Sequence, residues 1–264
     1  MNLELDDSIV LVVGGASGIG LACVDRFLAE NATVVIFDQS PACEQIATQR
    51  KNCHAHVIDI TQEATVRAAV TRVEQQIGPI RHVVHAAAVG SGKSGAPFTN
   101  LQPSDWRRVI EVNVLGVVNV AHAVTPAMME RSEGTMVFVA SVAGQIGSPT
   151  DPPYSASKAA NINFVQVMAK DLARHGIRVN TVCPGMVKTP LNQTVWQSWN
   201  DRQSVADKLT YEQWAAAKIK QLVPLGRWQK AEDIADMIVF LSSARASEVT
   251  GQTINVDGGY VMHS

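Results

Sequence analysis

The sequence predicts an α/β fold in which helices cover both faces of one sheet of seven parallel strands, within a single domain spanning residues 1–264. Short apolar runs rich in β-branched residues alternate with longer stretches of helical periodicity. Apolar runs that are each followed by a helix are typical of a parallel, doubly wound sheet. With 264 residues, 46% of them hydrophobic, the chain can bury a large core, and no linker or charge run divides it.

The apolar runs place the strands along the chain at 9–13, 33–37, 55–59, 82–86, 135–141, 178–183 and 253–256. Helical periodicity follows the first six of them, at 18–30, 41–50, 62–77, 103–130, 154–175 and, after a long excursion, 231–241. In such a sheet, ligands bind beyond the carboxyl ends of the strands. The chemistry is therefore expected at that edge.

Charge and cysteine usage exclude several classes of partner. The net charge is −2 with acids and bases interspersed, so neither a nucleic-acid-binding face nor a polybasic membrane patch is expected. The N-terminus "MNLELDDSIVLVV" has acids where a signal peptide needs bases, and no apolar run is expected to reach the length of a membrane span. The four cysteines form no C-x-x-C pair, which favours a reducing compartment over disulfides or a zinc site. These observations predict a soluble cytoplasmic protein that binds small molecules and copies of itself.

A glycine-rich turn follows the first strand. In "VVGGASGIG", Gly14, Gly18 and Gly20 separate that strand from an amphipathic helix. Glycines allow a tight turn and let backbone N–H groups approach a pyrophosphate at the helix N-terminus, where the positive end of the helix dipole favours an anion. The turn therefore predicts dinucleotide binding on a Rossmann-type sheet.

Two acids follow the next strands. Asp38 ends the second strand, where a carboxylate can accept hydrogen bonds from the adenosine ribose and repel a 2'-phosphate. No base follows it before Arg50, so NAD is expected rather than NADP; a helix-capping role for Asp38 is the alternative. Asp59 ends the third predicted strand, where it meets the adenine edge or caps a helix that starts at Thr61. Both interpretations of Asp59 stay open.

The stretch "PPYSASK" sets Tyr154 and Lys158 four residues apart, on one face of a helix that the prolines open. A free tyrosine has a pKa of about 10, and a nearby cation lowers it, so Tyr154 is a candidate proton carrier. A solvated surface pair is the alternative. Ser141, at the end of the fifth strand, can hydrogen-bond a substrate oxygen; no G-x-S-x-G motif surrounds it, so it is not expected to be a nucleophile.

The glycine spacing G-x-x-x-G-x-G resembles the short-chain dehydrogenase/reductase family. The resemblance covers nearly the whole chain, since further motifs occur in the family's order: Asp38, Asp59, "EVNVLG", "VASVAG", "YSASK", "RVNTVCPGMVKTP" and "NVDGG". It implies hydride transfer between NAD(H) and a secondary alcohol or ketone, with Asn113, Ser141, Tyr154 and Lys158 as catalytic residues. In this resemblance Lys158 also holds the nicotinamide ribose, and Asn113 holds a water that links Lys158 to solvent.

The resemblance also implies a division of labour, with residues 1–100 mainly binding the dinucleotide and 101–264 carrying the catalytic residues. No metal is implied, and a homotetramer joined through the helices at 103–130 and 154–175 is expected. The implied cofactor-binding residues are Gly14, Ser17, Gly18, Ile19, Gly20, Asp38, Asp59, Ile60, Ala86, Ala87, Tyr154, Lys158, Pro184, Gly185, Val187 and Thr189.

Two positions depart from the family pattern. Val13 stands where a threonine is usual, and "HAAAV" at 85–89 stands where Asn-Asn-Ala-Gly is usual. The usual polar side chains brace the backbone at the sheet centre, so other groups must satisfy it here. His85 either replaces one of these hydrogen bonds or is a core histidine without a chemical role.

The segment at about 188–225 is longer than a simple connection and predicts a helical flap over the substrate site. Its tryptophans, Trp196, Trp199 and Trp214, either wall the pocket or pack the flap, and residues 88–100 are expected to form the opposite wall. The resemblance implies a sugar, polyol or small hydroxy compound as substrate. A 3-oxoacyl thioester is the alternative, and a non-catalytic NAD-binding sensor is a further one.

Overall fold

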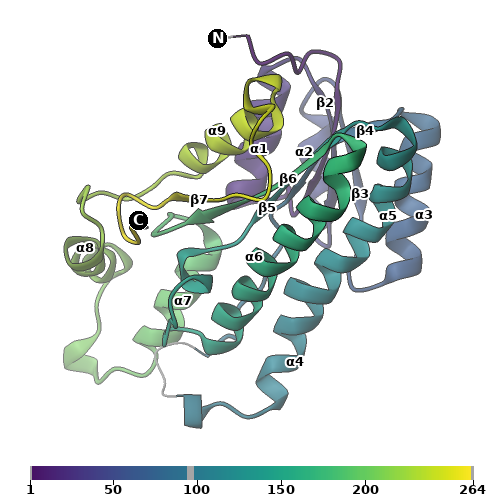
Figure 1. The fold of residues 1–264 in the computed structure, drawn as a ribbon. Helices are drawn as coiled ribbons and strands as arrows, with labels where there is room; N and C mark the ends of the chain where they lie inside the picture. Colours follow the sequence, from purple (N-terminus) through teal and green to yellow (C-terminus); the bar gives the residue numbers. More distant parts are fainter. Residues whose placement is uncertain (1, 94–97, 263–264) are drawn as a thin grey trace.

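The computed structural model describes residues 2–93 and 98–262, and its centre is one parallel sheet. Seven strands follow the order β3-β2-β1-β4-β5-β6-β7 (Figure 1). They are β1 (Ile9–Val13), β2 (Thr33–Asp38), β3 (Cys53–Val57), β4 (Ile80–His85), β5 (Gly134–Val139), β6 (Ile177–Pro184) and β7 (Thr253–Val256). The predicted doubly wound sheet is confirmed, although β3 and β5 end two residues earlier than predicted.

Helices cover both faces of this sheet (Figure 1). They are α1 (Gly18–Ala29), α2 (Ala42–Thr48), α3 (Glu63–Gln76), α4 (Ser104–Ile110), α5 (Gly116–Arg131), α6 (Pro152–Leu172), α7 (Pro190–Asn200), α8 (Tyr211–Leu222) and α9 (Ala231–Ser242). A π turn, η2 (Glu111–Leu115), joins α4 to α5, and there are 3-10 turns at η1 (Phe98–Asn100), η3 (Val142–Gly144), η4 (Ala173–His175), η5 (Val205–Asp207) and η6 (Ala244–Ala246).

Alternate residues of each strand point to opposite faces, which produces two large cores. Leu11 and Val13 of β1 join a core with α3, α5 and α6, while Val10 and Val12 join a core with α1, α2 and α9. All of β1 is buried, because both of its faces are covered. Burial on both faces explains why the strands appear in the sequence as continuous apolar runs.

The helical stretch Ser104–Arg131 needs a correction to the sequence analysis. By length and composition alone it could cross a membrane, since it spans 28 residues with a mean hydropathy of 1.4. In the structure, α5 packs against α3 and β4, and its Val117, Val120 and Val124 lie in the core. Here the apolar face of this stretch packs against the sheet layer.

Candidate active site

Two adjoining cavities lie at the carboxyl edge of the sheet. The glycine-loop cavity, of about 230 Å³, lies between the ends of β1, β2 and β3, and the tyrosine cavity, of about 220 Å³, lies beside the ends of β5 and β6. They share the wall residues Ile19, Ala86, Ala88, Thr189 and Leu191. A long ligand can therefore extend from one cavity into the other.

The predicted site residues divide between these cavities, with Asn113 as the exception. The glycine-loop cavity is lined by Gly14, Ser17, Gly18, Ile19, Gly20, Asp38, Asp59, Ile60, Ala86, Ala87 and Thr189. The tyrosine cavity is lined by Ser141, Tyr154, Lys158, Pro184, Gly185 and Val187.

Close packing explains the glycines of the loop. Gly14 has φ +82°, and a Cβ there would lie 2.5 Å from the nitrogen of Ala87. A Cβ at Gly20 would lie 2.0 Å from the carbonyl oxygen of Gly14. Real Cβ contacts are not so short, so both positions require glycine to bring the loop against the start of α1 and the end of β4.

Asp38 braces the glycine loop. Its Oδ2 accepts a hydrogen bond from the Ala16 N–H at 2.9 Å, and its Oδ1 accepts one from the Ser40 N–H at 2.9 Å. The residue before α2 is Pro41, so Asp38 does not cap that helix. A carboxylate has about four lone-pair sites, so capacity remains for ligand hydroxyls. Arg50, the next base along the chain, is paired with Asp25 at 2.7 Å.

Asp59 follows β3 and forms a local turn with Thr61. Its Oδ1 accepts from the Thr61 N–H at 3.0 Å and from the Thr61 hydroxyl at 2.7 Å, and these hydrogen bonds lower its pKa. Helix α3 begins later, at Glu63, so Asp59 is not its cap residue. Arg108 of α4 lowers the pKa of Asp59 further and lines the glycine-loop cavity. Sequence reasoning missed Arg108, because no motif marks it.

The two prolines open α6 as predicted. Asp151 precedes the helix, and its Oδ1 accepts the Tyr154 N–H at 3.3 Å. Tyr154 and Lys158 then lie one turn apart, with the Lys158 Nζ 5.5 Å from the Tyr154 ring centroid. That Nζ is buried and donates to the Val139 carbonyl oxygen at 2.7 Å. The pair lines the tyrosine cavity, so it is not a solvated surface pair.

The predicted lowering of the Tyr154 pKa by Lys158 is wrong for the protein alone. Burial raises the pKa of Tyr154 above its usual value, and a hydrogen bond with Ser141 opposes that rise only in part. Burial also lowers the pKa of Lys158 to about 8. The sequence analysis weighed the neighbouring cation and omitted the desolvation of both groups.

Ser141 lies where β5 passes into η3, beside Tyr154. Its Oγ accepts the Ala143 N–H at 3.1 Å, which fixes the side chain at the start of that turn. Because its hydroxyl and the Tyr154 phenol line one cavity and share a hydrogen bond, both can reach a single substrate oxygen.

Asn113 is fully buried in the π turn and lies outside both cavities. Its amide donates to the Val89 carbonyl at 2.9 Å and to the Ser157 hydroxyl at 3.0 Å, and it accepts the Val89 N–H at 2.8 Å. These bonds tie the segment after β4 to α6. The Ala86 N–H donates to the Val13 carbonyl at 2.8 Å. The Asn113 side chain and this backbone hydrogen bond therefore provide partners for N–H and C=O groups in the two segments where the sequence departs from the family pattern.

His85 does not replace the missing hydrogen bonds through its Nε2, which is buried and has no partner among the described residues. The ring stacks on Phe138 with centroids 5.9 Å apart. Burial, followed by the charge of Lys158, lowers the pKa of His85 to about 3, so the ring is neutral at pH 7. Cys183 is likewise a buried core residue, with a pKa raised to about 12 mainly by burial.

The predicted flap consists of α7, η5 and α8. Thr189 precedes α7 and accepts the Asn192 N–H at 3.3 Å. Trp196 and Trp199 pack within the flap against Trp214, and Trp214 also lines the tyrosine cavity. All three tryptophans therefore pack the flap, and Trp214 also forms part of the pocket wall.

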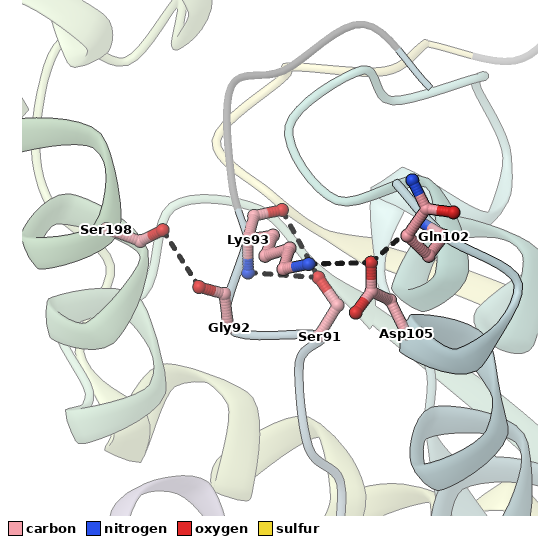
Figure 2. Close-up of polar contacts among 6 residues, drawn as sticks. All are labelled: Ser91, Gly92, Lys93, Gln102, Asp105 and Ser198. Carbon is pink, nitrogen blue, oxygen red and sulfur yellow. Dashed lines mark hydrogen bonds and ion pairs between the residues drawn. The ribbon is translucent and has the colours of Figure 1, made fainter. Parts of the chain in front are cut away.

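The segment after β4 faces the flap, as predicted for residues 88–100, of which 94–97 lie outside the described residues. Figure 2 shows Ser198 of α7 reaching Gly92, whose carbonyl oxygen accepts the Ser198 hydroxyl at 3.0 Å. Lys93 pairs with Asp105 of α4 at 2.8 Å (Figure 2). Gly90 itself lines the tyrosine cavity.

Several polar residues of the tyrosine cavity were missed from the sequence. Asn192 and Lys218 lie in the predicted flap, but no pattern there shows which side chains face inward. The other missed residues follow β5 or end the chain. Together they are Ser148, Thr150, Asp151, Asn192, Lys218 and Tyr260.

The chain is similar to known proteins over nearly its whole length. A family model described as Enoyl-(Acyl carrier protein) reductase matches residues 14–261. A 3-oxoacyl-acyl-carrier-protein reductase of Thermotoga maritima is 34% identical, over 98% of this chain and 100% of that protein. The 2-(S)-hydroxypropyl-CoM dehydrogenase 3 of Xanthobacter autotrophicus is also 34% identical, over 98% of each chain.

Solved structures agree with this similarity. Gluconate 5-dehydrogenase from Burkholderia cenocepacia, in complex with NADP and tartrate, is 30% identical with a TM-score of 0.86, over 98% of this chain and 97% of that one. Aldohexose dehydrogenase of Thermoplasma acidophilum is 25% identical with a TM-score of 0.86, over 100% of this chain and 98% of that one.

Proposed function

The chain belongs to the short-chain dehydrogenase/reductase family of oxidoreductases, which act on CH–OH groups with a nicotinamide cofactor, and on that premise we propose that it transfers hydride between NAD(H) and a small secondary alcohol or ketone. One observation carries the proposal: Ser141, Tyr154 and Lys158 line one cavity that shares a wall with the glycine-loop cavity. This arrangement fits a dinucleotide in one cavity whose reactive ring reaches the other.

Each side chain then has a separate role. Bound NAD supplies the hydride acceptor for the hydrogen on the alcohol carbon. Tyr154 takes the proton of the substrate hydroxyl during oxidation and returns it during reduction, while the Ser141 hydroxyl orients the same oxygen. Lys158 would hold the nicotinamide ribose, and the positive charge that favours the phenolate would come from Lys158 together with the bound oxidised nicotinamide. Asn113 does not contact the substrate; its role would be to position α6 relative to the segment after β4, through its hydrogen bonds to Val89 and Ser157.

The cavity volume supports a small substrate. The tyrosine cavity has a volume of about 220 Å³. A sugar, polyol or small hydroxy compound fits this volume. Reduction of a 3-oxoacyl thioester remains the second candidate, since the Thermotoga maritima relative carries that name.

A substrate screen tests the proposal. We expect NADH production with at least one compound from a panel of polyols, sugars, hydroxy acids and secondary alcohols. An NADPH-linked and NADH-linked screen of ketones and 3-oxoacyl thioesters, run beside it, identifies the second candidate. NAD binding without turnover across both panels would contradict the proposal and favour a non-catalytic sensor.

The preference for NAD rests on Asp38, whose charge lies in the glycine-loop cavity. We expect Asp38→Ala to reduce the NAD over NADP ratio of kcat/KM by at least about tenfold, because hydrogen bonds to charged groups contribute roughly 1.5–3 kcal/mol. Steady-state kinetics with both cofactors measures the ratio. Glu44→Ala, an exposed acid on α2, is the control and should keep the wild-type ratio. A wild-type enzyme that already prefers NADP would refute the assignment.

Further proposals concern organisation. We assign dinucleotide binding mainly to residues 1–100 and catalysis to 101–264, in a cytoplasmic homotetramer. Two large apolar side chains support assembly through the helices at 103–130 and 154–175, since Leu115 is 52% exposed and Val167 is 47% exposed.

A further inference from the structure

A lysine of the flap lies in the wall of the tyrosine cavity together with Ser141 and Tyr154. Lys218, on α8, is half-buried, and its Nζ lies 5.4 Å from the ring centroid of Trp214, one helical turn earlier. Trp214 is buried, so this contact fixes the lysine stem against the flap core. The half-buried position of Lys218 beside the Trp214 ring partly desolvates its ammonium, and this burial lowers its pKa.

Lys218 differs from two other lysines near the cavity, Lys188 and Lys93, because it has no acid partner among the described residues. Lys188, at the base of the flap, pairs with Glu212 at 2.6 Å, and Lys93, on the facing segment, pairs with Asp105 at 2.8 Å. No acid pairs with Lys218 within residues 2–93 and 98–262. A partly desolvated ammonium without a counter-charge favours an anionic ligand.

The other charged groups of the cavity already have partners. Asp151 accepts the Ser91 N–H at 2.8 Å and the Tyr154 N–H at 3.3 Å, so backbone dipoles stabilise its charge. Lys158 donates to the Val139 carbonyl and lies beside Tyr154. Lys218 is therefore the base of this cavity whose charge is left for the substrate.

We propose that Lys218 binds a carboxylate of the substrate, so that the substrate class is a small hydroxy acid or the corresponding oxo acid. The inference rests on the proposed function and narrows its substrate. One ammonium matches the single charge of a carboxylate, whereas a phosphate carries about −1.5 to −2 and needs more donors.

Binding of a matched pair tests the inference. Oxamate and oxamide have nearly the same size and shape, but only oxamate carries a carboxylate. Calorimetric titration of the NADH complex should show oxamate binding at least about tenfold more tightly, since hydrogen bonds to charged groups are the strong ones. In Lys218→Met, oxamate and oxamide should bind with equal affinity, whereas Lys218→Arg should keep the preference for oxamate. Lys220→Met, an exposed lysine on the same helix, should also keep it.

Turnover gives a second readout. Hydroxy acids are compared with their amides, and sugar phosphates with the free sugars, by kcat/KM. The inference is overturned if oxamate and oxamide bind equally, if the preference survives in Lys218→Met, or if phosphates are preferred over carboxylates. Turnover of neutral alcohols alone would overturn it and leave the proposed function intact. Failure of NADH to bind would overturn both.

Discussion

Replacing Tyr154 with phenylalanine is expected to lower kcat by about 10²–10⁴-fold, the usual contribution of a positioned proton-transfer group. The phenol lines the tyrosine cavity beside Ser141, and the substitution removes only its oxygen. Because the Asp151 carboxylate holds the Tyr154 backbone at the start of α6, and the substitution removes only the hydrogen bond with Ser141, the fold and the Kd for NADH should change little. Stopped-flow hydride transfer and NADH fluorescence titration measure the two quantities.

Tyr211→Phe is the matched control for this experiment. Tyr211 belongs to the flap and does not itself line the tyrosine cavity; its hydroxyl donates to the Oδ1 of Asn192, a lining residue, at 2.9 Å. Loss of this hydroxyl should change kcat far less than loss of the Tyr154 hydroxyl. Comparable turnover in Tyr154→Phe and wild type would show that another group moves the proton.

Replacing Lys158 with methionine is expected to lower kcat by at least about 10²-fold and to weaken NADH binding, because one ammonium serves both roles. The same change should stabilise the fold near pH 7. The folded pKa of about 8 is below the ordinary 10.5, so the charged form is disfavoured by about 3 kcal/mol. Loss of the hydrogen bond to the Val139 carbonyl costs about 1 kcal/mol of stability. The free energy of unfolding of Lys158→Met at pH 7 should therefore exceed that of the wild type by about 2 kcal/mol.

The pH dependence distinguishes this account from simple repacking. Between the folded pKa of about 8 and the ordinary 10.5, the unfolded chain binds more protons than the folded chain. The wild-type free energy of unfolding should therefore rise with pH through this window because of Lys158, and Lys158→Met should lack that rise. Urea unfolding at pH 7 and pH 10 measures both values. A variant that is less stable at pH 7, with an unchanged slope, would contradict the assignment.

The layout of the sheet was predictable because each strand is marked by residues within a short stretch of sequence. Strands buried on both faces need continuous apolar runs, so β1 and β2 are visible in the sequence. Gly14 and Gly20 were predictable because the backbone contacts that exclude a Cβ lie within a short motif. Motif order also indicates the carboxyl edge of the sheet, where both cavities lie.

The errors arise where the tertiary environment decides. The pKa of Tyr154 depends on burial, which four-residue spacing does not reveal. The π turn at Asn113 is a change of helical register with no marker in composition. Arg108 and Lys218 face cavities through the rotation of α4 and α8, and helical periodicity alone does not fix which surface the ligand occupies.

Helix α7 begins in residues that belong to both cavities, and this bears on the order in which a cofactor and an alcohol would bind. Thr189 and Leu191 line the shared wall, and Pro190 lines the glycine-loop cavity. A dinucleotide that packs there supports the first turn of the flap before any alcohol arrives, whereas an alcohol arriving first meets a flap without that support. Under the proposed function, this geometry predicts that the cofactor binds before the alcohol.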